Sequence, residues 1–329
     1  MDSMFRKLTN LINKHEKIIL MTHAKPDLDG MGSAIVLFKI IDRLKKQCYI
    51  VSPKQNIDNC LNKALSLVNE NIDVSFISEE EIQVDKDTLL IVLDTQKPEL
   101  VECSNLLDII QDKVIIDHHI KADSYIKDAL CYICDSTKSS VVEIIVEYLN
   151  FLNYDLDGLL ATILLAGLEV DTNSFNFKTT ERTFKVAGFL INHGANLILK
   201  QEILKEPMNE LIKRYDYIKN SQKVTDNIIL CVMDNNLHDN VEIALLAKEL
   251  LKIESIQASF AIGKLTNNII GISARSMGNI NVGEIMNLLG GGGHLTDAAC
   301  QIENKSIEEV SQALKKVIKE GNYEGYIIK

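Results

Sequence analysis

The chain has 329 residues, of which 46% are hydrophobic and 25% charged, and its formal net charge is −11 at pH 7. This length suffices for two domains with separate cores, and the composition is that of a globular protein. The acidic balance argues against binding of long nucleic acid, which needs clustered lysine and arginine at the phosphates. No N-terminal segment has the order of a signal peptide, and no apolar run is long enough to cross a bilayer.

The cysteines indicate a reducing compartment. There are seven, an odd number, and most lie inside apolar runs, as packing thiols of a cytoplasmic protein do. Cys131 and Cys134 have the spacing of half a zinc site, but no second pair accompanies them, so we predict a strand there.

The first half of the chain alternates short apolar runs with amphipathic stretches, the pattern of a parallel sheet covered by helices. The expected strands are Lys17–His23, Gln47–Val51, Asp73–Ile77, Leu89–Asp94, Val114–Asp117 and Leu130–Cys134. The expected helices are Asp2–Asn13, Gly32–Lys45, Asp58–Val68, Glu99–Ile110, Ser139–Phe151, Asp157–Glu169 and Glu181–Asn192.

A long helical stretch follows, from Leu197 to Asn220, and Pro207 is expected to break or kink it. The pattern then restarts with a strand (Ile228–Met233), a helix (Ile243–Leu251), two strands around Asn267 and Asn268, a glycine-rich segment and a last helix (Ile307–Lys319). We therefore predict an N-terminal domain at 1–193, a helical linker at 194–223 and a C-terminal domain at 224–329.

Acidic and histidine residues cluster after the apolar runs. The first cluster holds His23, Asp27 and Asp29, in a loop that Pro26 keeps out of the helical conformation and that leads to a helix expected near Ser33. The two aspartates can face one ion if the loop curls around it. A turn with a helix cap would explain one of them, so both interpretations stay open.

Three further clusters follow along the chain. Asp94 ends a strand and by itself is typical of a cap or turn. The adjacent imidazoles in Asp117-His118-His119 cannot both lie in an apolar core without partners. Asp171 closes an apolar helix, where a buried carboxylate needs a partner or a metal. Open α/β sheets bind ligands at the carboxyl ends of their strands, and four aspartates with two histidines suit Mn²⁺, Mg²⁺ or iron.

Four consecutive glycines precede His294. Glycine is unfavourable inside helices and strands, but it lets the backbone approach a ligand, and successive N–H groups can bind an anion. Arg275, upstream, could hold a phosphate with two parallel hydrogen bonds. A flexible hinge is the alternative, although the flanking segments are apolar and regularly patterned rather than linker-like.

These motifs carry a family resemblance that covers nearly the whole chain. The elements HxxxDxDGxGS, LDT, DHH and AGLEVDT, in this order, resemble the DHH phosphoesterase family, and GGGGH resembles its associated second domain. The segments LLAGLEVDTNSF, TTERTFKVAGFL and INVGEIMNLLGGGGHLTDAA, with Arg275-Ser276, are similar to the catalytic part of GdpP-type cyclic di-AMP phosphodiesterases. Those proteins usually carry membrane helices and sensory domains first. This chain starts with the catalytic part, so we do not expect membrane tethering.

The resemblance implies an α/β fold of two domains, a parallel sheet flanked by helices and a smaller mixed-sheet domain. It implies two Mn²⁺ ions, with Mg²⁺, Co²⁺ or iron as alternatives, that activate a water for in-line attack on phosphorus. Asp94, and with it Asp171, is expected to lie between the ions. His119 is expected near the scissile phosphate, and Asp117 to orient an imidazole; which of His118 and His119 binds metal stays open. The implied metal ligands are His23, Asp27, Asp29, Asp94, His118 and Asp171. The implied substrate-binding residues are Arg275, Ser276, Gly290, Gly291, Gly292, Gly293 and His294.

The predicted function is Mn²⁺-dependent hydrolysis of cyclic di-AMP to linear pApA, AMP or both. The alternative within the family is a nanoRNase, or a phosphatase of pApA or 3′-phosphoadenosine 5′-phosphate, acting on short linear substrates. The acidic charge disfavours a RecJ-type exonuclease, and the GGGGH segment disfavours a manganese pyrophosphatase. A nucleotide-binding regulator with an inactive site is disfavoured, because all six implied metal-ligand positions hold residues that can bind a metal. Expected partners are a small nucleotide and a second copy of the chain, with no membrane and no long nucleic acid.

Overall fold

The computed structural model describes residues 1–54, 57–121, 123–321 and 323. Its contacts divide the chain into two compact units, Met1–Glu206 and Pro207–Lys329. The range 194–223 contributes one helix to each unit, because α8 (Leu197–Leu204) ends before Pro207 and α9 (Met208–Lys219) begins after it. The break expected at this proline is therefore confirmed.

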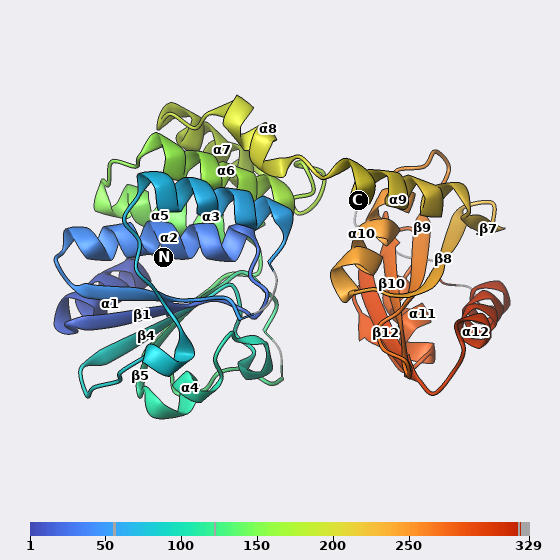
Figure 1. Cartoon of the computed structure of the whole chain (residues 1–329), viewed down its shortest axis with the longest axis horizontal. Coiled ribbons are helices and arrows are strands. Elements are labelled where there is room, and N and C mark those ends of the chain that lie inside the picture. The colour runs from blue at the N-terminus through green and yellow to red at the C-terminus, as the bar shows by residue number, and fades with distance from the viewer. Residues whose placement is uncertain (55–56, 122, 322, 324–329) are drawn as a thin grey trace. The chain divides into compact units, whose positions relative to one another are not determined.

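A six-stranded sheet forms the centre of the first unit, in the order β3-β2-β1-β4-β5-β6 (Figure 1). All of its pairings are parallel. All six residues of β4 are buried, which explains its unbroken apolar run, since parallel strands are covered on both faces. The strands are β1 (Lys17–Met21), β2 (Gln47–Val51), β3 (Phe76–Ile77), β4 (Thr88–Leu93), β5 (Asp112–Asp117) and β6 (Cys131–Cys134).

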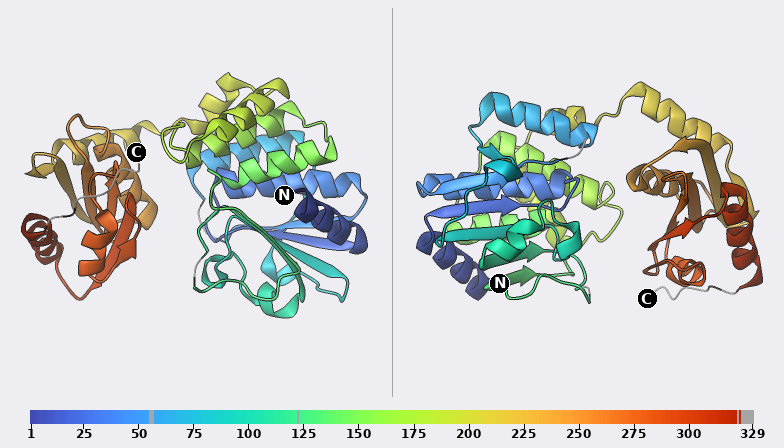
Figure 2. Two further views of the ribbon diagram at one scale, coloured as in Figure 1. Left: turned by 180° about the vertical axis from the view of Figure 1, so that it is seen from behind. Right: turned by 60° about the horizontal axis from the view of Figure 1, so that its bottom comes forward.

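Helices cover the two faces of this sheet unequally. The main hydrophobic core joins one face to most of the helices, whereas α4 packs on the other face with a smaller core. Figure 1 shows α2, α5, α6 and α7 on one side of the strands and α4 on the other, and Figure 2 shows the same layers from behind. The further helices are α1 (Asp2–Lys14), α2 (Leu28–Arg43), α3 (Asn59–Asn71), α4 (Asn105–Ile109), α5 (Val141–Leu152), α6 (Gly158–Asp171) and α7 (Glu181–Asn192), with short 3-10 helices at Glu79–Glu81 and Pro98–Leu100.

Two expected helices of the first unit were wrong in extent. The helix predicted from Gly32 begins four residues earlier, at Leu28, because Asp27 caps it. The helix predicted at Glu99–Ile110 is interrupted, since Val101 forms an isolated bridge with His23 and the Glu102 N–H donates to the Thr22 carbonyl. That extended segment lies against the loop that follows β1.

A mixed sheet forms the second unit, in the order β11-β12-β10-β9-β8-β7. Strands β8 and β9 pair in parallel, and the other pairs are antiparallel. Helix α10 packs on one face, and α11 and α12 pack on the other. The elements are β7 (Gln222–Thr225), β8 (Ile228–Leu237), α10 (Asn240–Leu250), β9 (Ala258–Lys264), β10 (Ile269–Ser276), α11 (Val282–Leu288), β11 (Gly292–Gly293), β12 (Asp297–Glu303) and α12 (Ile307–Glu320).

The α/β fold with a parallel and a mixed sheet confirms the predicted class. The glycine-rich segment, however, holds three elements that the sequence did not predict, α11, β11 and β12. Cys131 and Cys134 lie on β6 and are free, as expected. Among the described residues, no helix has the length and apolar character needed to span a bilayer.

Candidate metal centre

The strand order places a switch point beside β1. From β1 the chain builds β2 and β3 on one side, then crosses to build β4, β5 and β6 on the other. Loops that leave neighbouring strands in opposite directions open a crevice at their carboxyl ends, where α/β proteins bind ligands. The clusters after β1, β4 and β5 all lie at this end of the sheet, and Asp171 reaches it from the C-terminus of α6.

The loop after β1 presents His23 and Asp27. Asp27 is the cap of α2, and one of its carboxylate oxygens accepts a hydrogen bond from the Gly30 N–H at 3.0 Å. The same oxygen lies 3.9 Å from His23 Nε2. Asp27 can therefore cap α2 and, with the same carboxylate, also face a bound ion.

Asp29 lies in the first turn of α2 and is fully buried. Its two oxygens accept hydrogen bonds from the N–H groups of Val141 and Val142, both at 2.8 Å. These N–H groups belong to the first turn of α5, where a helix leaves donors free and favours negative charge. The helix end thus holds the carboxylate in one orientation.

Asp94 follows β4 with a φ of +64°, in the left-handed region that aspartate tolerates better than most residues. Its N–H donates to the Ile116 carbonyl at 2.9 Å, which ties the turn to β5. Gly30 makes room beside it, because a Cβ there would lie 3.1 Å from Asp94 Oδ2. This backbone conformation directs the Asp94 carboxylate toward the other clustered residues, and such strained conformations are common at functional sites.

Asp94 stands between two histidines. Its Oδ2 lies 3.4 Å from His23 Nε2, and its Oδ1 lies 3.4 Å from His118 Nε2. His118 Nε2 also lies 3.2 Å from Asp171 Oδ2 and 3.9 Å from Asp29 Oδ2. Two candidate metal groups result, His23 with Asp27 and Asp94, and His118 with Asp29 and Asp171, and Asp94 reaches both.

The two adjacent histidines differ in surroundings. The side chain of His118 is 5% exposed and that of His119 is 54% exposed. His119 Nδ1 lies 2.7 Å from Asp117 Oδ1, whose partner oxygen accepts a hydrogen bond from Gln96 Nε2 at 2.9 Å. His119 Nδ1 also lies 3.8 Å from Asp94 Oδ1, in a third candidate group. Asp117 therefore orients His119, while His118 projects among the carboxylates.

Charge crowding perturbs the pKa values of these groups. Burial, and then the charge of nearby aspartates, raises the pKa of both Asp29 and Asp171. Burial lowers the pKa of His23, but contacts with Asp27 and Asp94 outweigh it and raise that pKa to about 11. Burial also lowers the pKa of His118, but the contacts with Asp94 and Asp29 outweigh it and raise that pKa. The surrounding carboxylates thus favour the protonated form of both imidazoles when no metal is bound.

A divalent cation fits these donors. Asp94 Oδ1 is buried without a hydrogen-bond partner among the described residues, an expensive state that a coordinated ion would relieve. Carboxylate oxygens combined with imidazole nitrogens suit Mn²⁺, Mg²⁺ or iron. The set contains no thiol, which disfavours a thiolate zinc site.

Two residues near the centre were missed from sequence. Gly167 lies where α6 crosses α2, and a Cβ there would lie 2.8 Å from the Leu28 carbonyl oxygen, so only glycine lets α6 bring Asp171 close. Gln96 holds Asp117 and also donates to the His119 carbonyl at 3.1 Å. No local sequence pattern at either residue indicates its contact, because the partner lies far away in the sequence.

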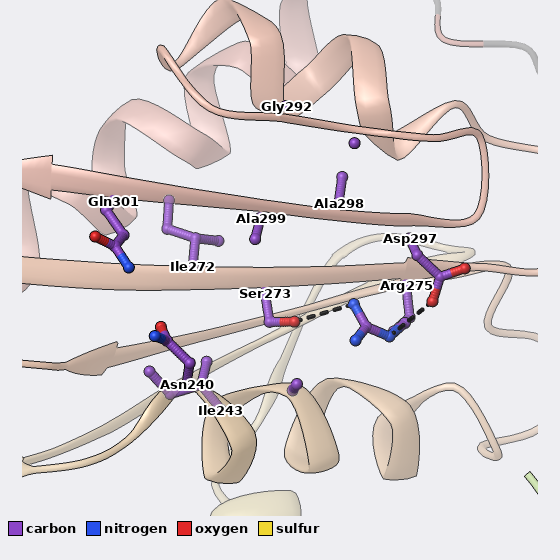
Figure 3. Close-up of a pocket in the computed structure, with 12 residues that line it drawn as sticks. Asn240, Ile243, Ile272, Ser273, Arg275, Gly292, Asp297, Ala298, Ala299 and Gln301 are labelled. Atoms are coloured by element: carbon purple, nitrogen blue, oxygen red, sulfur yellow. Dashed lines mark hydrogen bonds and ion pairs between the residues drawn. The ribbon is translucent and has the colours of Figure 1, made fainter. Parts of the chain in front are cut away.

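The residues predicted for substrate binding all lie in the second unit, but only some line its pocket. Arg275, Gly292 and Gly293 line a pocket of about 490 Å³ (Figure 3). Ser276 is buried, with its Oγ accepting from the Gly278 N–H, and His294 is exposed beyond the pocket lining.

The four glycines serve distinct structural needs. Gly290 has a φ of +83° after the end of α11, and the N–H groups of Gly290 and Gly291 donate to the carbonyls of Asn287 and Met286, which terminates the helix. Cβ atoms at Gly291 and Gly293 would lie within 2.4 Å of β12. A Cβ at Gly292 would meet nothing closer than 3.4 Å. The N–H groups of Gly290 and Gly291, predicted to face an anion, are thus engaged within the protein, and Gly292 and Gly293 pair with β12.

Comparisons with known proteins agree with this arrangement. Residues 17–168 match the DHH family, N-terminal domain, and residues 225–320 match the DHHA1 domain. The chain is 35% identical over 322 residues to the cyclic-di-AMP phosphodiesterase GdpP of Bacillus subtilis, covering 95% of this chain and 49% of that protein. It thus spans about half the length of this relative. It is 26% identical to the bifunctional oligoribonuclease and PAP phosphatase NrnA of Mycoplasma genitalium, covering 94% of this chain and 96% of that protein.

A solved structure shares the fold. The exopolyphosphatase-related protein of Bacteroides fragilis superposes with a TM-score of 0.79 at 19% identity, covering 97% of this chain and 98% of that one. The sheet order, the placement of the acidic and histidine clusters and the two domain matches lead to one conclusion. The chain belongs to the DHH phosphoesterase family, with a DHH N-terminal domain followed by a DHHA1 domain.

Proposed function

We propose that the chain is a metal-dependent phosphodiesterase that hydrolyses cyclic di-AMP. The observation that carries the proposal is the position of Asp94, whose two oxygens face His23 on one side and His118 on the other. A carboxylate shared between two donor groups suits a pair of cations, the arrangement that phosphoryl-transfer enzymes use. The similarity to GdpP over 95% of this chain supports the cyclic dinucleotide as substrate.

In this proposal, His23, Asp27 and Asp94 hold one Mn²⁺ ion, and Asp29, His118 and Asp171 hold a second together with Asp94. Ions at such a site supply positive charge for the phosphoryl oxygens and make water a stronger nucleophile at neutral pH. The fixed orientation of Asp29 by α5 and of Asp94 by its turn keeps the donors in place before substrate arrives.

His119 is proposed as the proton donor to the leaving oxygen. Burial lowers its pKa, but the hydrogen bond to Asp117 and the charge of Asp94 outweigh burial and raise it, which favours the ring form that can donate a proton. With Nδ1 turned to Asp117, Nε2 is left for the phosphate. Each hydrolysed ester consumes one water: its oxygen bonds to phosphorus, the bond from phosphorus to the 3′-oxygen breaks, and that oxygen takes a proton.

A second candidate is hydrolysis of short linear substrates such as pApA or 3′-phosphoadenosine 5′-phosphate. The match to NrnA covers almost the full length of both proteins, which favours it. Both candidates use the same metal centre and differ only in the substrate accepted. A homodimer and a cytoplasmic location belong to the same proposal and rest on the family resemblance.

The test is chromatography of the products after incubation of the purified protein with cyclic di-AMP and Mn²⁺. We expect pApA or AMP, absent without metal and absent for Asp94→Asn. Cleavage of pApA with the cyclic compound left intact would replace the first candidate by the second. No turnover of either compound, with metal bound, would refute both.

A further inference from the structure

Glu143 is a buried carboxylate in the first turn of α5. It is the third residue of the helix and is 0% exposed. A glutamate at this position commonly bonds back to the N–H of the N-cap residue. The side chain of Glu143 turns elsewhere, and its Oε1 accepts hydrogen bonds from Ser139 Oγ at 2.7 Å and from Thr183 Oγ1 at 2.6 Å. Burial of a carboxylate is costly, and packing alone would be served better by an apolar side chain. These two contacts therefore indicate a role beyond packing.

The first of these contacts fixes the turn of α5 that binds Asp29. Val141 and Val142, the first two residues of the helix, donate their N–H groups to the Asp29 oxygens, both at 2.8 Å. Ser139 lies just before the helix, so its bond to Glu143 ties the incoming chain to this same turn. The direction of the two N–H groups, and with it the orientation of Asp29, therefore depends on Glu143.

The second contact ties α5 to α7, close to the segment that follows Asp171. Thr183 lies in the first turn of α7, and Figure 1 shows α5, α6 and α7 on the same side of the sheet. Residues 173–175, after the end of α6, have φ values of +49°, +55° and +62°, a left-handed run that L-residues rarely adopt. The Phe175 ring stacks on that of Phe184, with centroids 5.7 Å apart. The end of α6 that carries Asp171 is thus held to the start of α7.

We propose that Glu143 is a positioning residue for the cation held by Asp29, His118 and Asp171. It connects the turn that orients Asp29 to the helix that follows Asp171, and both carboxylates approach His118 Nε2, at 3.9 and 3.2 Å. The other candidate group comes from the loops after β1 and β4, so Glu143 should leave its ion unchanged. The inference rests on the proposed function, because that function assigns a second cation to this group.

The experiment is calorimetric titration of the metal-free full chain with Mn²⁺. The parent should bind two ions, and Asp171→Asn identifies the second ion as the one that it weakens. Glu143→Leu leaves both hydroxyl groups without their acceptor and should weaken the same ion by about 10–100-fold, as loss of a group behind a metal ligand does. Glu143→Gln keeps an oxygen acceptor of the same length and should bind both ions as the parent does.

Thr183→Val provides the test if Glu143→Leu does not fold. It removes one of the two hydroxyl groups and should weaken the second ion in the same direction. Combined with Glu143→Leu it should cause no further loss, because both changes remove the same contact. The control for stability is Val146→Ala, since Val146 is buried in the core further along α5. Val146→Ala should lower the unfolding temperature in EDTA and keep the affinity for both ions.

Unchanged or equal affinities for the two ions in Glu143→Leu and Thr183→Val, relative to the parent, would overturn the inference. An equal loss of the second ion in Glu143→Gln would overturn it too, because the charge and not the hydrogen bonds would then matter. An equal loss in Val146→Ala would assign the effect to stability, with the same consequence. A parent that binds fewer than two ions would overturn both the inference and the paired cations of the proposed function. Selective loss of the second ion, in a parent protein that leaves cyclic di-AMP and pApA intact, would uphold the inference and refute the proposed function.

Discussion

At the scale of single residues, Asp94 has the most constrained position in the candidate centre. It combines a left-handed backbone, a buried side chain, an oxygen that accepts no hydrogen bond from the described residues, and approaches of 3.4 Å to two histidines. The sequence predicted that Asp94 lies between two ions only through the family resemblance, because a lone aspartate after a strand is more often a cap. The residues next to Asp94 in the sequence do not indicate that its two oxygens face two different histidines.

Asp94→Asn should abolish activity without disturbing the fold. Asparagine also tolerates positive φ, so the turn should persist, while one charge of the metal set is lost. We expect activity to fall by more than about 100-fold, since loss of even a group behind a metal ligand costs about 10–100-fold. Activity and bound Mn²⁺ are to be measured together. Asp128→Asn is the matched control, because Asp128 also has a positive φ of 59° but is exposed. Retained Mn²⁺ binding and activity in Asp94→Asn would refute the role.

His23 should make the metal-free protein less stable as pH rises. Its pKa is about 11 in the folded chain against 6.5 in the unfolded chain, so its contribution is complete below 6.5 and is lost as the pH rises through 11. The free energy of unfolding should fall by at most about 1.4 kcal/mol per pH unit in between. Denaturation in EDTA at pH 7 to 9 should show a shallower slope for His23→Gln than for the parent. Parallel slopes would contradict the prediction, and His193→Gln, at the end of α7, is the control.

At the scale of elements, the crossing of α2 and α6 determines the distance between Asp29 and Asp171. Gly167 and Gly32 lie at that crossing, where added Cβ atoms would lie 2.8 Å from Leu28 O and 3.1 Å from Ile163 Cγ2. The first of these contacts is with backbone, which cannot move aside as a side-chain end can. Close approach of the two helices is therefore a requirement of the site as well as of the core.

Gly167→Ala should separate the helices and weaken both stability and catalysis. Overpacking of this kind costs about 1–3 kcal/mol. Gly188→Ala on α7 is the matched control, because its Cβ would meet nothing within 4 Å. Replacing a helical glycine by alanine there should stabilise by about 0.5–1 kcal/mol. Urea denaturation and turnover are to be measured for both. If Gly167→Ala is as stable and as active as Gly188→Ala, the close approach of α2 and α6 is not required for stability or for activity.

Periodicity predicted the elements well where apolar runs were long and less well elsewhere. Strands β1, β2, β4 and β5 occur where expected, because a buried parallel strand is apolar throughout. Strands β11 and β12 were missed because glycines, and alternating small residues such as Ala298 and Ala299, give a weak strand pattern. The predicted helix from Glu99 failed because Val101 pairs with the distant His23, a contact that no local pattern encodes.

At the scale of the whole molecule, the two units have separate hydrophobic cores. One core of helices and strands lies within residues 5–204, and the cores of the second unit lie within 217–323. Each unit is large enough to bury a core of its own. The metal groups lie in the first unit and the pocket in the second.

The fragments 1–206 and 207–329 should each fold alone. We expect a cooperative thermal transition for each by circular dichroism. Mn²⁺ at about 100 times its dissociation constant should stabilise only the first, by about 2.7 kcal/mol. A fragment without a cooperative transition would show that its core depends on the other unit, and Mn²⁺ binding by 207–329 would contradict the assignment of the centre.

The order of the clustered residues along the chain also matters while the protein is being made. His23 and Asp27 leave the ribosome first, Asp94 and His118 follow, and Asp171 emerges only at the end of α6, after all six strands of the first sheet. The donors are brought together by parallel pairing across the sheet, which forms slowly because its contacts are distant in sequence. A nascent chain therefore cannot complete the group of Asp29, His118 and Asp171 before α6 has been synthesised, and this second cation must be loaded after that point.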